Sequence, residues 1–299
     1  MAEEIPVHFS CNQDELYGVL HLPEQPGPRG VLIIVGGPQY RVGSHRQFVL
    51  LARALADHGI VGMRFDQRGT GDSEGDSRSF EDINADVRAA VDALIAHVPV
   101  LKEVVIWGLC DAASAALFYA PTDPRISGLV LLNPWVRSEV GIARTYLQHY
   151  YFTRLLDANF WRKIFRGELN FRVALRSFLE NITVGLGWKK GAQQEANIPT
   201  QTAVTKNGSS NQACASEPFP ERMRDGLAKF RGRVLFILSG DDLTAGEFKD
   251  LIAVSRGWKK LLRAPRVQRR DLAEANHTFS RRTWRDQVAS WTKEWIGSW

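Results

Sequence analysis

The sequence predicts an α/β protein whose mostly parallel sheet is covered by helices on both faces. Two observations favour this class. Short, continuous apolar runs, typical of strands buried on both faces, recur along the chain. Segments with apolar residues at helical spacing separate them, as helical crossovers separate parallel strands. The apolar runs are residues 30–35, 60–65, 104–107, 126–132 and 234–238.

The first elements follow from local patterns. Residues 7–10 and 16–22 alternate apolar and polar side chains around Asn12-Gln13-Asp14, which predicts an antiparallel hairpin at an edge of the sheet. Residues 45–58 and 80–98 have apolar positions at helical spacing. Helices are therefore expected in both segments.

The last elements show the same alternation. A helix is expected over residues 248–262, a short strand over 267–272, and then a final helix with Trp284, Trp291 and Trp295 on one face. Such a stripe could form a membrane-interface belt, but an apolar face packed on the sheet is the simpler interpretation.

The chain of 299 residues could hold two average domains, or one large α/β domain with an insertion. After residue 136 the periodicity changes. Residues 137–182 are rich in aromatics and arginine at helical spacing, and residues 189–217 lose hydrophobicity altogether. We expect a core of residues 1–136 and 226–299, with a helical cap at 137–225 that contains a mobile loop near 189–217.

Composition limits the class of protein. Apolar content of 44% and charged content of 24% are typical of globular domains, and no run approaches the roughly 18 residues of a transmembrane span. The first ten residues, MAEEIPVHFS, have neither the basic nor the apolar region of a secretory signal. Cys11, Cys110 and Cys214 lack the paired spacing of a zinc site or disulfide framework. A cytoplasmic protein is expected.

Nucleotide binding is not expected. Residues 66–75 contain Gly69-Thr70-Gly71, but no helix follows directly and a third glycine is misplaced, so the dinucleotide-binding fingerprint is not met. The net charge of +5 is modest, and no nucleic-acid partner is expected.

Residues 104–116, VVIWGLCDAASAA, predict a strand, a sharp turn and a helix, with Cys110 at the turn. A nucleophile elbow of the G-x-S-x-G kind needs that order; Ala112 replaces the second glycine. The helix N-terminus would stabilise a thiolate at Cys110. The Asp111 carboxylate would oppose it, so we expect Asp111 to point away or to meet a basic partner. The alternative is that Cys110 is a buried small hydrophobe.

A histidine and an acid follow in the order nucleophile, acid, histidine, which is that of the α/β-hydrolases. His277 follows the last expected strand and would act as the base. Asp242 is the first choice for the acid because the acid commonly lies two to three residues after a glycine, here Gly240; Asp241 is the second choice. No metal or redox cofactor is required for this chemistry.

An oxyanion hole is expected beside the nucleophile. Its first donor would be the backbone N–H of Asp111, and the second would come from the loop at residues 36–40. Pro38 has no N–H group, which leaves Gly37 or Gln39 as the second donor. The alternative is a structural turn without a donor role.

Five segments together resemble exosortase A system-associated hydrolase 1, a branch of the α/β-hydrolase superfamily. They are GGPQYRVGSHRQF (36–48), RFDQRGTGDSEG (64–75), GLCDAASAAL (108–117), SGDDLTAGEF (239–248) and HTFSRRTWR (277–285). The resemblance spans nearly the whole chain and thins over residues 189–217. It implies a bacterial cytoplasmic enzyme associated with exopolysaccharide and protein-sorting gene clusters, and it supports fold and triad better than substrate.

The expected reaction is thiolate attack on an ester or thioester, with an S-acyl intermediate resolved through His277. Thioester hydrolysis leads; acyl transfer to an amine, hydroxyl or thiol is the close alternative. A non-catalytic hydrolase-fold module that binds an acyl or carrier group is a third interpretation.

The expected cap supplies the candidates for substrate binding. Residues 137–190 hold ten basic and four acidic side chains, so a coenzyme A thioester or an acidic carrier protein is an expected partner. Solvated helix faces are the alternative. The aromatic candidates for an acyl-binding site are Tyr40, Trp135, Tyr146, Tyr150, Phe160 and Trp161, with Tyr151, Phe152 and Phe165 as further cap aromatics.

Overall fold

The computed structural model describes residues 2–37, 39–136 and 218–299. Residues 1–136 and 219–299 form one compact unit, and the description below is of that unit. The expected cap lies outside the described residues, except for its last part from residue 218 to 225.

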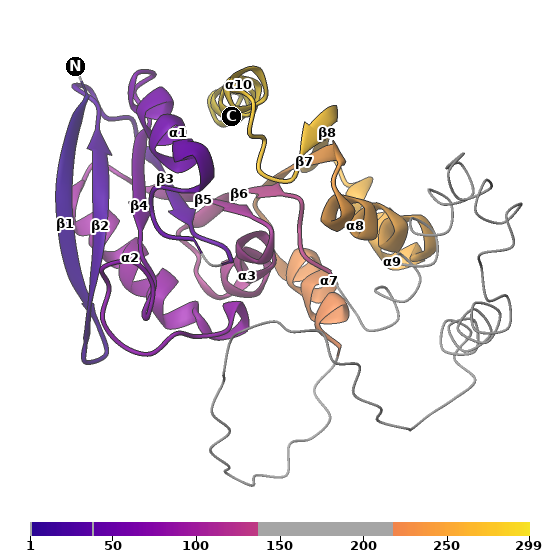
Figure 1. Cartoon of the computed structure of the whole chain (residues 1–299), viewed down its shortest axis with the longest axis horizontal. Coiled ribbons are helices and arrows are strands. Elements are labelled where there is room, and N and C mark those ends of the chain that lie inside the picture. Colours follow the sequence, from indigo (N-terminus) through magenta and orange to yellow (C-terminus); the bar gives the residue numbers. More distant parts are fainter. Residues whose placement is uncertain (1, 38, 137–217) are drawn as a thin grey trace, which may run out of the picture. The chain divides into compact units, whose positions relative to one another are not determined.

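The described residues form one eight-stranded sheet in the order β1-β2-β4-β3-β5-β6-β7-β8 (Figure 1). The strands β1, β2 and β4 pair antiparallel, and every pairing from β4 through β3 to β8 is parallel. The predicted mostly parallel sheet with an antiparallel hairpin at its edge is therefore confirmed. The strands are β1 Glu3–Cys11, β2 Asp14–Leu22, β3 Arg29–Ile34, β4 Val61–Phe65, β5 Glu103–Leu109, β6 Ile126–Leu132, β7 Arg233–Asp241 and β8 Val267–Asn276.

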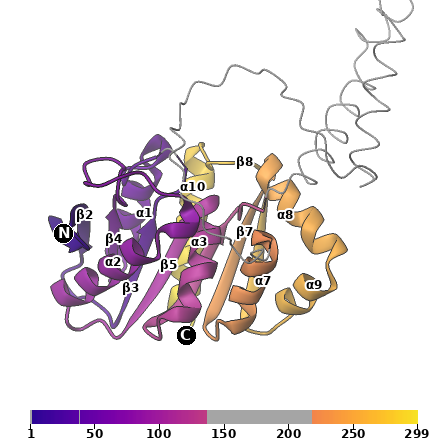
Figure 2. The ribbon, with the colours of Figure 1, turned by 90° about the horizontal axis from the view of Figure 1, so that it is seen from below.

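Helices cover both faces of this sheet (Figure 1 and Figure 2). On one face lie α1 Gln47–Ala56 and α10 Arg282–Gly297. The other face packs against α2 Asn84–His97, α3 Asp111–Tyr119, α7 Phe219–Lys229, α8 Leu243–Val254 and α9 Arg256–Leu262. The three-layer arrangement explains why the central strands are nearly continuous apolar runs.

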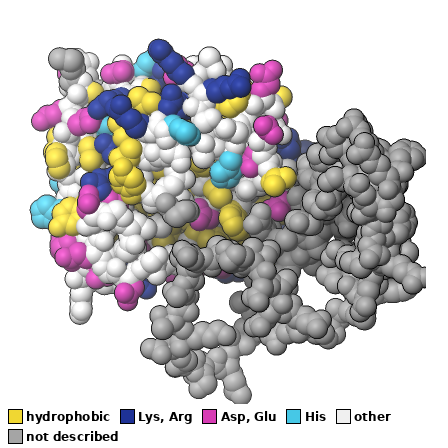
Figure 3. Space-filling model, viewed as in Figure 1, with side chains coloured by type: hydrophobic (Ala, Val, Ile, Leu, Met, Phe, Trp, Pro, Cys, Tyr) yellow, Lys and Arg dark blue, Asp and Glu magenta, His cyan; other side chains and the backbone are white. Residues whose placement is uncertain are grey.

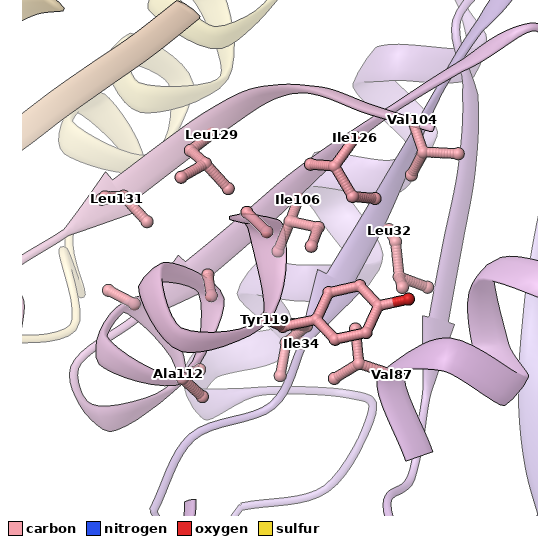
Figure 4. Packing of buried hydrophobic residues seen from close by; sticks show 14 of the residues in the cluster. Leu32, Ile34, Val87, Val104, Ile106, Ala112, Tyr119, Ile126, Leu129 and Leu131 are labelled. Atoms are coloured by element: carbon pink, nitrogen blue, oxygen red, sulfur yellow. The ribbon is translucent and has the colours of Figure 1, made fainter. Parts of the chain in front are cut away.

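Successive residues of a central strand point into different cores. In β5, Val104 and Ile106 belong to the core under α2 and α3, whereas Val105 and Trp107 belong to the core under α1 and α10. Figure 4 shows the first of these cores, where strand side chains meet Tyr119 of α3. Each such buried side chain contributes about 1.5–3 kcal/mol of hydrophobic stabilisation, so the sheet provides a rigid platform.

Three segments expected as single helices are divided. In residues 80–98, a 3-10 turn at Phe80–Asp82 precedes α2, with Ile83 between them. In residues 45–58, a 3-10 turn at Ser44–Arg46 with left-handed φ angles precedes α1. In residues 248–262, Ser255 adopts an extended conformation between α8 and α9, and its hydroxyl accepts the N–H of Trp258 at 3.4 Å. Ser255 is the N-cap residue that stabilises the start of α9. The spacing of the apolar residues continues from α8 into α9, so it does not reveal this break.

The tryptophan stripe of α10 packs inward. Trp295 is buried, and Trp284 and Trp291 pack against the same core under α10, which confirms the packing interpretation. Among the described residues, no helix is long and apolar enough to cross a membrane.

The parallel strands bring chemically active loops to one edge. The carboxyl ends of β3, β5, β6, β7 and β8 lead directly into the loops that carry the expected site residues. Ligands of open α/β sheets bind at this edge.

Candidate active site

Cys110 occupies a strained turn between β5 and α3. Its backbone has φ 65° and ψ −125°, a conformation that costs a non-glycine residue about 1–3 kcal/mol. The Cys110 N–H donates to the carbonyl oxygen of Leu132 at 2.9 Å, which holds the turn against β6. A Cβ atom at Gly108 would lie 2.7 Å from the carbonyl carbon of Ala112, so glycine is needed for the close approach of α3. This is the geometry expected of a nucleophile elbow.

The imidazole of His277 lies between an acid and the thiol. Its Nδ1 is 2.9 Å from Oδ2 of Asp242, and the Cys110 side chain is its other hydrogen-bonding partner. The hydrogen bond to Asp242, followed by the one to Cys110, raises the pKa of His277 to about 10. With Nδ1 committed to the carboxylate, Nε2 is left for the sulfur. The arrangement can therefore hold a thiolate–imidazolium pair.

Asp242 is fixed by two further interactions. It is the N-cap of α8, and its carboxylate accepts the N–H groups of Thr244 at 3.2 Å and Ala245 at 3.0 Å. Burial disfavours the charged carboxylate, but the hydrogen bonds from His277 and the α8 backbone outweigh burial and lower the pKa of Asp242. Asp241 is exposed and ends β7 opposite Asn276. The structure thus brings the first-choice acid to the imidazole.

Asn133 ties the site together and was missed from the sequence, where it marked only a strand end. The residue is fully buried and has φ 42°. Its Nδ2 donates to Ser239 Oγ at 2.8 Å and to the His277 carbonyl at 3.1 Å, while its Oδ1 accepts the Ser239 N–H at 2.9 Å. One amide therefore links the ends of β6 and β7 to the histidine loop.

The Asp111 carboxylate is held by backbone N–H groups and not by the basic partner that was one of its two expected arrangements. It accepts the Gly37 N–H, at 2.8 Å to Oδ1 and 3.0 Å to Oδ2, and the Ala112 N–H at 2.9 Å. Burial raises the pKa of the Asp111 carboxyl, and these hydrogen bonds offset the effect only in part. The carboxylate therefore accepts the hydrogen bond of the Gly37 N–H, which was expected to donate to an oxyanion.

The loop after β3 contains the other oxyanion candidate. Gly37 has φ 61° and is exposed, so its N–H can face the site. The side chain of Gln39 folds back within the loop, where its Oε1 accepts the Ser44 N–H at 2.9 Å. The Gly37 N–H contacts the start of α3 through the Asp111 carboxylate, and the backbone N–H of Gln39 stays the alternative donor.

A cavity of about 620 Å³ opens beside this loop. Tyr40, which is 50% exposed, lies at its wall, and so do Asp111 and the buried Gln67. The other polar side chains of the wall are Gln39, Thr70, Ser77, Arg78 and Ser79. Trp135 is half-buried, and its backbone N–H donates to the Cys110 carbonyl oxygen at 3.2 Å. The wall of this cavity, which Asp111 joins at the start of α3, is therefore mixed in polarity.

The other residues expected to bind substrate lie outside the described residues. They are Tyr146, Tyr150, Phe160 and Trp161, together with the rest of the cap. Within residues 2–37, 39–136 and 218–299, no group of three or more His, Cys, Asp or Glu side chains is arranged to hold a metal ion.

Comparison with known proteins gives the family and the fold. The family model described as "Serine aminopeptidase, S33" matches residues 26–176. The structure is similar to esterase Pf2001 of Pyrococcus furiosus, with a TM-score of 0.63, 16% identity, and coverage of 100% of this chain and 93% of the esterase. It is similar to Est1E of Butyrivibrio proteoclasticus, solved with ferulic acid bound, with a TM-score of 0.60, 16% identity, and coverage of 97% of each chain. These likenesses confirm the α/β-hydrolase fold.

A shorter stretch is similar to a curated relative. The chain is 26% identical over 127 residues to polyketide transferase grgF of a Penicillium species. The match covers 41% of this chain and 42% of the transferase, so the chain aligns with less than half of that relative's length.

Proposed function

This chain belongs to the hydrolase family described as serine aminopeptidase, S33, and on that basis we propose that it is an ester or thioester hydrolase with a cysteine nucleophile. The observation that carries the proposal is the placement of the His277 ring between the Asp242 carboxylate and the Cys110 thiol. Cys110 also has the strained backbone of an elbow. Nucleophile, base and orienting acid are the three parts that acyl transfer requires.

The reaction proceeds in two balanced steps. The Cys110 sulfur attacks the carbonyl carbon, the bond to the alcohol or thiol breaks, and His277 protonates that leaving group. Water then attacks the S-acyl carbon; His277 takes its proton, the carbon–sulfur bond breaks, and the thiol is restored. Asp242 holds the imidazole tautomer, and the N–H groups of Asp111 and Gly37 are the proposed donors to the oxyanion.

Cysteine in place of the family's serine favours thioesters. An S-acyl enzyme and a thioester substrate are close in energy, so acyl exchange in both directions is easy. Acyl transfer is the second candidate, and the similarity to a polyketide transferase favours it over a module that only binds.

The proposal also includes the carrier of the acyl group and the cellular location of the enzyme. On the face viewed in Figure 3, basic and acidic side chains are interspersed over the described residues. The sequence of residues 137–190 instead has ten basic and four acidic side chains. We assign to this segment, within a cap at 137–225, the recognition of coenzyme A or an acidic carrier. A bacterial cytoplasmic enzyme of the exosortase-associated hydrolase branch, acting near exopolysaccharide synthesis, fits this substrate class.

The test is turnover of an ester and thioester panel by cysteine variants. Cys110→Ala should abolish turnover without loss of folding, and Cys110→Ser should keep a small fraction of it. Cys11→Ala is the matched control because Cys11 is a free cysteine buried in the core away from the elbow. Equal turnover by Cys110→Ala and the parent would refute the nucleophile.

A further inference from the structure

The Asp111 carboxylate lies where an oxyanion would bind. Donors to an oxyanion stand about 2.7–3.1 Å from its oxygen. The Gly37 N–H stands 2.8 Å from Oδ1 of Asp111, and the Ala112 N–H donates to the same oxygen at 2.9 Å. The Gly37 donor assigned to the oxyanion hole is thus engaged by a side chain of the same protein.

The loop after β3 is shaped to accept this side chain. A Cβ atom at Gly36 would lie 2.3 Å from Oδ1 of Asp111 and 2.6 Å from the Leu109 carbonyl oxygen. Any other residue at position 36 would displace the carboxylate or the loop. The carboxylate also lines the cavity of about 620 Å³, so it has space to leave its seat.

We propose that the Asp111 side chain is a built-in occupant of the oxyanion hole, which a substrate carbonyl must displace before the reaction proceeds. The inference rests on the proposed function, because it concerns the same site. A carboxylate that stays in place keeps the Gly37 N–H from the oxyanion. It also puts a second negative charge beside the tetrahedral oxyanion, which repels it. The idle site is thereby less reactive toward small carbonyl compounds, and larger substrates use remote binding energy to open it.

The competing explanation is that the carboxylate is a support. It would hold Gly37 in place so that the loop keeps its shape, and the hole would then weaken when Asp111 is removed. The two explanations predict opposite signs for the same measurement.

Two small probes separate them. An alkyl trifluoromethyl ketone accepts the Cys110 thiolate at its carbonyl carbon and becomes a hemithioketal alkoxide, with nothing leaving, so its inhibition constant reports the oxyanion hole. Iodoacetamide alkylates the same sulfur and releases iodide without forming an oxyanion. Dividing the ketone's affinity by the alkylation rate removes any change in thiolate reactivity.

The variants are Asp111→Ala, which empties the seat, and Asp111→Asn, which keeps its shape but removes the charge. Asp241→Asn is the control, since it removes an exposed acid at the same edge of the sheet. We expect the normalised ketone affinity to rise at least about tenfold in both Asp111 variants, a part of what one oxyanion donor is worth. The control should change less than about twofold, as exposed charges are screened.

An unchanged or weaker normalised affinity in both Asp111 variants would overturn the proposal in favour of the support. Alkylation of Cys110 in preference to the buried Cys11 shows that a variant keeps its folded core. If the parent enzyme shows neither alkylation of Cys110 nor ketone binding, the proposed function itself fails and the Asp111 proposal fails with it. If both occur and the normalised affinity does not rise, only the Asp111 proposal fails.

Discussion

Asp242 and Asp111 lie at the starts of α8 and α3, and each carboxylate accepts two backbone N–H groups from other residues. They differ in one partner. Asp242 is hydrogen-bonded to His277, and its pKa is lowered. Asp111 is hydrogen-bonded by amide N–H groups and feels His277 only through its charge, and its pKa is raised. Burial disfavours ionisation of both. A hydrogen bond to the imidazole therefore decides whether the pKa of a buried carboxyl in this site is lowered or raised. The carboxylate with the lowered pKa is the one that is held more firmly as an anion.

The largest effect is expected at the acid–histidine side. Asp242→Asn should lower turnover about 10⁴-fold, because an amide holds the wrong imidazole tautomer, as in the serine triad. Steady-state kinetics on a small thioester would measure it. Asp241→Asn is the matched control and should cost less than about tenfold, since Asp241 is exposed and the ring Nδ1 is paired with Asp242. A reversal of the two effects would transfer the acid's role to Asp241.

A second effect concerns the pH dependence of stability. His277 has its pKa raised from 6.5 to about 10, so its pairing with Asp242 stabilises the fold fully below pH 6.5 and is lost as pH rises toward 10. The lowered pKa of Asp242 makes the same pairing weaken again as pH falls below about 4.

The melting temperature of the parent minus that of Asp242→Asn should therefore be greatest between about pH 4 and 6.5 and should shrink toward pH 10. Thermal unfolding at matched ionic strength would measure the difference. A difference that grows between pH 7 and pH 10 would contradict the charged pair.

A third effect tests the support of the histidine loop. Asn133→Ala leaves the buried Ser239 N–H and the His277 carbonyl without this partner, which should cost about 1–3 kcal/mol in the free energy of unfolding. Turnover should fall as well, because the His277 ring is no longer held in position by the hydrogen bond from Asn133 to the His277 carbonyl. Asn12→Ala is the control: Asn12 also has a left-handed φ, of 58°, but is exposed in the β1–β2 turn. The Asn12→Ala variant should lose stability without loss of turnover. Equal losses of turnover in the two variants would show that Asn133 does not support the active site.

The smallest effect is expected outside the described residues, in the cap sequence. Charge reversal of Arg162, Lys163 and Arg166 to glutamate should raise KM for a coenzyme A or carrier thioester and weaken its salt dependence, because steering by charge is lost. Small neutral esters should be unaffected and act as the internal control. If neither quantity changes, the basic segment does not recognise the partner.

The two sides of the site also differ in what the sequence could predict. Cys110 and Asp242 each follow a buried strand, and His277 follows the short last strand. Parallel strands bring their carboxyl ends to one edge, so strand patterns sufficed to predict that the three residues meet. The seat of Asp111 depends on the shape of a loop 74 residues away. Asn133 acts through Ser239, which is 106 residues away. Such side-chain pairings leave no periodic signal.

The same limit explains the errors in secondary structure. The helix α7, FPERMRDGLAK, was not expected because charged residues dominate it and few apolar positions mark its buried face. The break at Ser255 was missed since apolar spacing continues on both sides of it. Periodicity reports which residues face a core, but not where the backbone is interrupted by a cap.

If the proposed function is right, acyl groups pass through the sulfur of Cys110. Incubation of the parent enzyme with a panel of acyl thioesters, rapid acid quench and intact-mass measurement test this directly. We predict one added acyl group, mapped by peptide mass to Cys110, which forms in Asp242→Asn more slowly and is absent from Cys110→Ala. Turnover by the parent with no acyl group on Cys110 under any quench, or an adduct that persists in Cys110→Ala, would contradict the claim.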